Sequence, residues 1–236
     1  MGTIQAKNNP SSRITAGDRV IQGAKSVNTT VIKAKLARFA KAHTAYSAAQ
    51  RAVEVAEQRL VAAEERVGET DGAQDALVKL LAAKMIGDGA PKGNPLSLFK
   101  LPPPSELVIV RVEVEVKKTK QLAKQAASWK SASSATKSVA AKLGKAAAAV
   151  ESALKKIAPL AKAHTAAIAK RDALGVDWVT SFTHLKNAAR VAEDDGTRGL
   201  FAALFEAPTA RPATKAKPTS ADGAATAPAA PLAPAT

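Results

Sequence analysis

The sequence contains no cysteine, which excludes disulfide bonds, thiolate nucleophiles and cysteine-ligated metals. Aromatic residues are also scarce: they make up 3% of the chain, although 46% of its residues are hydrophobic. Alanine supplies most of that apolar count. A composition of this kind suits long helices with thin contacts between them better than it suits a thick globular core.

Long uncharged apolar runs are missing as well. No stretch of 18 apolar residues is free of charge, so we expect no transmembrane segment. The first 17 residues are polar with scattered charges and do not resemble a signal peptide, which predicts a cytoplasmic location.

Residues 32–67 are predicted to form one long amphipathic helix that ends at Gly68. Large apolar residues recur every seven positions from Phe39, and alanines recur every seven positions from Ala42. The two sets interleave at spacings of three and four, as in the seam of a coiled coil: Phe39, Ala42, Tyr46, Ala49, Val53, Ala56, Leu60 and Ala63. Alanine at every second position lets a partner helix approach closely. We therefore expect Ala49→Leu to destabilise the protein more than His43→Ala, with His43 only flanking the seam.

A second long helix is predicted over about residues 135–193, with Ser134 as its N-cap. Pro159 predicts a kink or a local break within it. Its apolar face is predicted to pack antiparallel on the first helix, through Leu154, Ile157, Ala161, Ile168, Trp178 and Phe182.

Shorter helices are expected at about residues 71–86, 105–127 and 199–206. Thr70 or Asp71 is a candidate N-cap for the first of these and Asp75 lies in its first turn, while Asp18 is a candidate N-cap near the start of the folded region. The run 107–116 alternates valine with other residues and also fits a strand, which would have to pair between chains. The helical surroundings favour helix.

The predicted fold is therefore all-α: an elongated helical bundle of long, antiparallel, coiled-coil-like helices. Residues 1–17 are expected to be a disordered tail, and residues 18–206 a single domain that contains a linker at 87–104. The segment from 207 to 236, rich in alanine, proline, threonine and lysine, is expected to be a second disordered tail.

A short sequence match links the two long helices. The segment from Ala40 to Ala45 recurs from Ala161 to Ala166, and the match extends to ten identities over 21 positions. Duplication and chance similarity between alanine- and lysine-rich helices both account for it. In an antiparallel pair the two copies would face each other, bringing His43 close to His164.

No constellation for catalysis or metal binding stands out. None of the three histidines has a carboxylate three or four residues away, and the glutamates of the first long helix alternate with arginines as on a solvated face. No glycine-rich phosphate-binding motif is present. We predict no enzymatic activity, no catalytic or metal site, no cofactor and no small-molecule substrate.

The chain is strongly basic, with a net charge of +15 and a pI near 10.1. Between Glu115 and Glu151 there are no acidic residues, and this segment carries about half of the net charge through Lys117, Lys118, Lys120, Lys124, Lys130, Lys137, Lys142 and Lys145. These lysines are candidates for binding phosphates without reading bases.

The favoured function is a non-catalytic scaffold or adaptor that acts through helix–helix surfaces. Self-association or a protein partner would cover apolar residues left over at Trp178, Phe182, Leu200 and Phe201. Non-specific nucleic-acid binding is the first alternative. In composition, the alanine-rich body followed by the Lys/Pro/Ala segment from Ala207 resembles histone-like tails and phasins, the proteins that coat polyester granules. This resemblance implies coating of a lipid or polymer surface as a second alternative.

Overall fold

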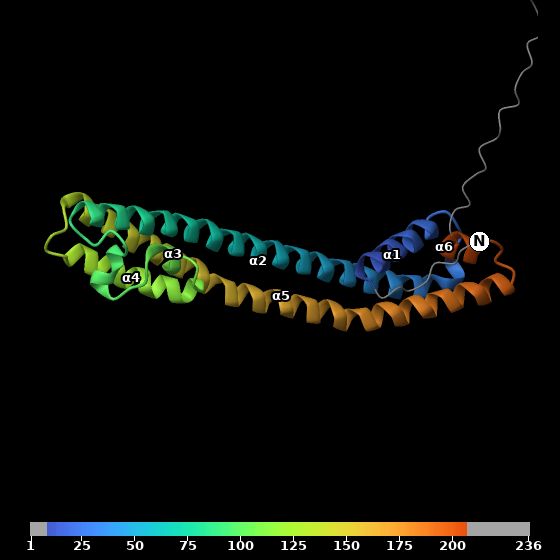
Figure 1. Ribbon diagram of the computed structural model, residues 1–236. Coiled ribbons are helices and arrows are strands. Elements are labelled where there is room, and N and C mark those ends of the chain that lie inside the picture. The colour runs from blue at the N-terminus through green and yellow to red at the C-terminus, as the bar shows by residue number, and fades with distance from the viewer. Residues whose placement is uncertain (1–8, 207–236) are drawn as a thin grey trace, which may run out of the picture.

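The computed structural model describes residues 9–206, all of whose regular elements are helical. Two long helices, α2 (Lys33–Gly87) and α5 (Ser134–Asp194), run antiparallel and form the body of an elongated molecule (Figure 1). At 1.5 Å per residue α5 is about 90 Å long. The predicted all-α fold of long antiparallel helices is confirmed.

α2 is one helix of 55 residues, so the predicted stop at Gly68 and the separate helix at 71–86 were wrong. Neither Gly68 nor Gly72 interrupts it. A glycine in a helix costs only about 1 kcal/mol relative to alanine. Val78, Leu81 and Met85, buried against the helices at the far end, offset that cost.

α5 begins one residue earlier than predicted, because Ser133 rather than Ser134 is its cap: the Thr136 amide donates to Ser133 Oγ at 3.2 Å. The helix continues through Pro159 without the local break that was one of the predicted outcomes. Figure 1 shows α5 as one gently curved helix.

One end of the molecule is built around α1 (Pro10–Ala24) and α6 (Leu200–Phe205), which pack on each other and on the long helices. A short 3-10 turn, η1 (Thr30–Ile32), leads into α2. The expected tail over residues 1–17 is thus wrong from residue 10 onward. Asn9 caps α1 by accepting from the Ser11 amide at 2.9 Å, and Pro10 occupies its first position. Residues 1–8 and the expected tail at 207–236 lie outside the described part of the chain.

The other end holds η2 (Pro95–Phe99), α3 (Pro104–Leu107) and α4 (Val112–Ser128). The helix predicted over 105–127 is therefore two helices, separated by four non-helical residues at 108–111. No part of residues 107–116 is a strand. α4 buries a helical face instead, spaced by three and four residues: Glu115, Val116, Thr119, Leu122, Ala123 and Ala126.

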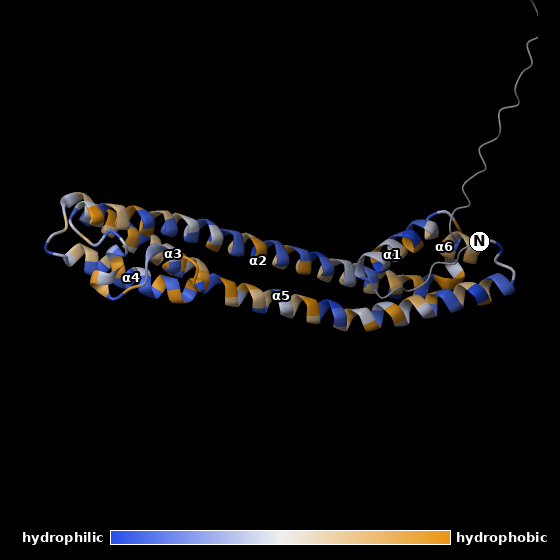
Figure 2. Cartoon of the chain, viewed as in Figure 1, coloured by the Kyte–Doolittle hydropathy of each residue, from blue (hydrophilic) through white to orange (hydrophobic). Residues whose placement is uncertain are grey.

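The hydrophobic core is divided between the two ends. One cluster joins α1, α6 and the adjoining ends of α2 and α5, and the other joins η2, α3 and α4 to the opposite ends of the long helices. Over most of the length between them α2 and α5 pair alone, and only the start of α4 reaches Asp71, Leu154 and Ile157. No residue of segments 54–73 and 154–174 is buried, and we call these two segments the waist. Figure 2 shows hydrophobic residues interspersed with hydrophilic ones along both of its helices.

Candidate functional site

The residues predicted to form the helix-packing seam fall into two groups along α2 and α5. Those near the α1/α6 end are buried: Phe39, Tyr46, Ala49, Val53, Trp178 and Phe182. Those in the waist are half-buried: Ala56, Leu60, Ala63, Leu154, Ile157, Ala161 and Ile168. Ala42, near the α1/α6 end, is also half-buried. The difference arises because α1 and α6 pack at the end of the molecule that holds the first group, whereas in the second group only Leu154 and Ile157 lie beside another helix, the start of α4.

The apolar residues expected to await a partner are already covered by this chain. Trp178 and Leu200 are at most 1% exposed and Phe182 is 2% exposed, while Phe201 is half-buried. The rings of Trp178 and Phe182 stack at 5.0 Å, and Phe205 of α6 packs edge-on against Phe182. The prediction that these residues are exposed was wrong, because the sequence pattern does not show that α6 folds back onto α5.

His43 is a core residue rather than a residue beside the seam. It is 3% exposed, and both ring nitrogens are engaged. The Trp178 indole N–H donates to Nδ1 at 3.1 Å, so Nδ1 carries no proton and Nε2–H donates to Asp18 Oδ1 at 2.8 Å. Asp18 is therefore a partner of His43 in the middle of α1, not an N-cap.

These contacts also set the pairing of the long helices. His43 lies opposite Trp178, and Arg171 of α5 donates to Gln50 of α2 at 3.2 Å. His164 is 14 residues away from Trp178 along α5, roughly 20 Å at the helical rise. The matching segments 40–45 and 161–166 therefore do not face each other, and no site joins His43 to His164.

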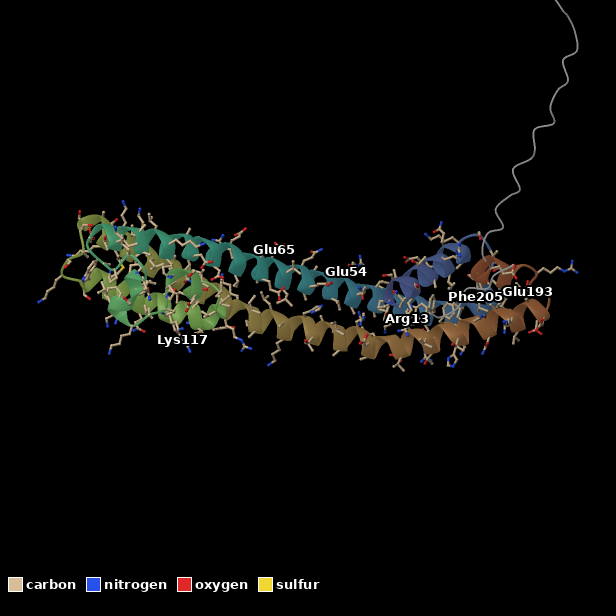
Figure 3. The ribbon with its side chains drawn as sticks, viewed as in Figure 1. Arg13, Glu54, Glu65, Lys117, Glu193 and Phe205 are labelled. Atoms are coloured by element: carbon tan, nitrogen blue, oxygen red, sulfur yellow. The ribbon has the colours of Figure 1, made fainter. Side chains whose placement is uncertain are left out.

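The waist carries opposite charges on its two helices. Segment 54–73 of α2 holds six acidic and two basic residues, a net charge of −4, and segment 154–174 of α5 holds five basic residues and one acidic residue, a net charge of +4. Among the described residues no salt bridge joins the two segments. Most of these charges face solvent, as Figure 3 shows for Glu54 and Glu65, whereas Asp71 and Arg171 are half-buried.

Apolar residues lie between the waist charges. A groove on α2 has Val61 and Ala62 in it with Glu54, Glu57 and Glu65 around them, and Val61 is 45% exposed. A second groove lies between α2 and α5 and contains Val55, also 45% exposed, with Leu160 and Ala163. Exposed apolar residues within a charged rim are typical of surfaces that contact another protein.

The eight lysines lie at the α3/α4 end. Lys117, Lys118, Lys120 and Lys124 are on α4, Lys130 is in the loop that follows, and Lys137, Lys142 and Lys145 are on α5. All are exposed except Lys118 and Lys120, which are half-buried. Lys120 donates to Glu151 Oε2 at 2.7 Å, and this hydrogen bond is the main cause that lowers the pKa of Glu151.

Sequence reasoning missed a buried carboxyl cluster where α4 crosses α2. Asp71 and Asp75 lie one turn apart in the middle of α2, not at a helix start, and Glu115 of α4 lies against them. Glu115 is 1% exposed. Burial, and then its contact with Asp75, raises the pKa of Glu115 to about 8. Burial also raises the pKa of Asp71. The i, i+4 aspartates were visible in the sequence, but their third partner is 40 residues further on.

Comparison of the chain with protein-family models, curated proteins and solved structures finds no match. Within residues 9–206 no helix is both long and apolar enough to cross a bilayer.

Proposed function

We propose that this chain is a non-catalytic structural protein that self-associates through its waist and holds its two ends apart. The observation that carries the proposal is the waist itself. It is about 30 Å long at the helical rise, contains no buried residue, and presents a net charge of −4 on α2 and +4 on α5.

A second copy supplies the matching surface. When two copies meet at their waists, the acidic segment of each α2 lies against the basic segment of the other α5, and Val61 loses contact with water. Such mutual contacts suit a two-fold dimer. A contact of about 30 by 20 Å buries roughly 1,200 Å² in total, the lower end of the range for specific interfaces, so the association should be weak and salt-sensitive.

A charge-swap experiment tests the proposal in light scattering after gel filtration. One variant carries lysine at Glu54, Glu57 and Glu65, and the other carries glutamate at Lys155, Lys156 and Lys162. Wild-type protein should dimerise at low salt, and each variant alone should be monomeric because its two waist segments have the same sign. An equimolar mixture of the variants should restore the dimer.

Single variants separate the apolar contact from the charges. Val61→Lys should weaken the dimer, whereas Val191→Lys, at a residue of α5 that is 59% exposed and outside the waist, should leave it unchanged. Monomeric wild-type protein at low salt and high concentration would rule out self-association. A dimer that Val191→Lys weakens as much as Val61→Lys does would place the contact elsewhere.

The lysine-rich end supports a second candidate function, the binding of an anionic polymer such as nucleic acid. Its exposed lysines can contact phosphates, and affinity should fall steeply with salt and ignore base sequence. In a gel-shift titration at two salt concentrations, replacing Lys117, Lys124 and Lys145 with glutamine should weaken binding. Replacing Lys33, Lys35 and Lys41 at the opposite end of the molecule should not, and equal loss in both variants would exclude a site at the lysine-rich end.

A further inference from the structure

The carboxyl cluster between α2 and α4 offers more oxygen atoms than its hydrogen bonds use. One ligand oxygen from each of Asp71, Asp75 and Glu115 lies within 4.8 Å of the others. In this cluster Oδ1 of both aspartates and Oε2 of Glu115 are buried without a hydrogen-bond partner. Buried acceptors of this kind are costly unless a proton donor or a cation satisfies them.

Two neutral side chains extend the set of oxygens. Gln74 is fully buried between the aspartates, and its Nε2 donates to Glu115 Oε1 at 2.9 Å. This bond orients the Glu115 carboxylate and leaves Oε2 for another ligand, as a residue behind a metal ligand does. Thr119, one helical turn after Glu115 and fully buried, has a hydroxyl without a partner, and so does the Gln74 carbonyl oxygen.

The charges of the cluster are not balanced by basic side chains. Among the described residues no lysine or arginine nitrogen forms a salt bridge with Asp71, Asp75 or Glu115. Three carboxylates brought together with one fully buried repel each other strongly. Either a proton on Glu115 or a bound cation relieves that repulsion, and only a cation uses the unpartnered oxygens of all three carboxylates.

We propose that Asp71, Asp75 and Glu115, with Gln74 and Thr119 beside them, form a binding site for one hard divalent cation that ties α4 to α2. The ligands are all oxygen atoms and most are carboxylates, the donors that Mg²⁺, Ca²⁺ and Mn²⁺ prefer, whereas nitrogen and sulfur ligands suit zinc and copper. Asp71 lies at the end of the α2 waist segment, but none of the cluster residues is changed in the charge-swap variants.

Mn²⁺ binding to the full-length protein tests the site directly, since free Mn²⁺ gives an electron paramagnetic resonance signal that is lost on binding. After treatment with a chelator, wild-type protein should bind one Mn²⁺ per chain, and competition with Mg²⁺ and Ca²⁺ should show which of the three binds most tightly. At saturating cation the melting temperature should rise by about 5 °C.

Two variants of the proposed ligands and one control test whether the cation binds at this cluster. Glu115→Gln and Asp75→Asn should each abolish binding and the thermal shift. Glu115→Gln keeps the shape of the side chain, so its chelated form should melt no lower than the wild type. Glu65→Gln, at an exposed residue of α2, should bind the cation like the wild type. The proposal is wrong if wild-type protein binds no cation at about 10 mM, roughly ten times the Kd of the weakest protein calcium sites. Binding unchanged in Glu115→Gln would equally overturn it, as would a loss just as large in Glu65→Gln.

Discussion

The indole N–H of Trp178 donates a 3.1 Å hydrogen bond to Nδ1 of His43, joining α5 to α2 in the core at the α1/α6 end. The other nitrogen of the His43 ring reaches Asp18 of α1. One imidazole thus links three helices that are distant in sequence. Phe39 stacks on the same ring at 5.8 Å, which holds it in a single orientation.

His43→Ala should destabilise the protein by about 2–4 kcal/mol, because it opens a cavity and leaves the Trp178 N–H unpaired. This reverses the expectation from sequence, which ranked Ala49→Leu above it. Ala49 is 6% exposed, and Ala49→Leu should still cost about 1–3 kcal/mol through overpacking. Denaturant unfolding at neutral pH measures both changes. His164→Ala, at a half-buried position, is the control and should cost under about 1 kcal/mol. Equal effects of His43→Ala and His164→Ala would contradict the role of the His43 contacts.

Gly23→Ala should destabilise the α1/α6 end of the molecule. A Cβ atom on Gly23 would collide with the backbone carbonyl of Ala203, which cannot rotate away as a side chain can. Gly68→Ala is the matched control, since its Cβ meets nothing within 4 Å and it should stabilise α2 by about 0.5–1 kcal/mol. Thermal melts of the two variants should therefore move in opposite directions, and a rise for Gly23→Ala would show that α1 and α6 do not pack this closely.

Asp88→Asn should make stability less dependent on pH in the acid range. Asp88 Oδ2 accepts from the Thr136 hydroxyl at 2.6 Å and from the Ser133 amide at 2.8 Å, and these bonds lower the pKa of Asp88. Because the pKa is lower in the folded protein, the stabilisation is present above the unfolded pKa. It is lost as pH falls through the folded value. The difference in unfolding free energy between wild type and Asp88→Asn should shrink as the solution is acidified. A difference that stays constant with pH would show that the charge of Asp88 does not contribute to stability.

Pro159→Ala should stabilise α5. Pro159 is exposed inside the helix and has no N–H to donate to the carbonyl four residues earlier. Replacement restores that hydrogen bond and should raise the unfolding free energy by about 1–3 kcal/mol. Denaturant unfolding measures it, with the exposed Ala158→Ser as a control for the effect of substitution at this turn. A loss of stability would mean that α5 needs proline at this position to stay in contact with α2.

Much of the architecture could be read from local patterns. The recurrence of Phe39, Tyr46 and Val53 at intervals of seven predicted the buried face of the first half of α2, and both ends of α5, Ser134 and Asp194, lie within one residue of their predicted positions. Helix boundaries failed where a local signal was ambiguous. Asn9-Pro10 is equally typical of a turn and of a helix start, and Gly68 ends a helix only when nothing further along stabilises it.

The candidate sites depended on contacts that no local pattern contains. The charge of each waist segment was present in the sequence, but its exposure follows from where α1, α4 and α6 stop covering the long helices. Periodicity and composition determined that this chain forms long helices with one apolar face each, because those properties depend on residues within a few turns of each other. Only the tertiary structure decided that His43 meets Trp178 and that Glu115 meets Asp71 and Asp75. The offset between two antiparallel helices, and the point where a third crosses them, are set by side-chain packing over the whole core.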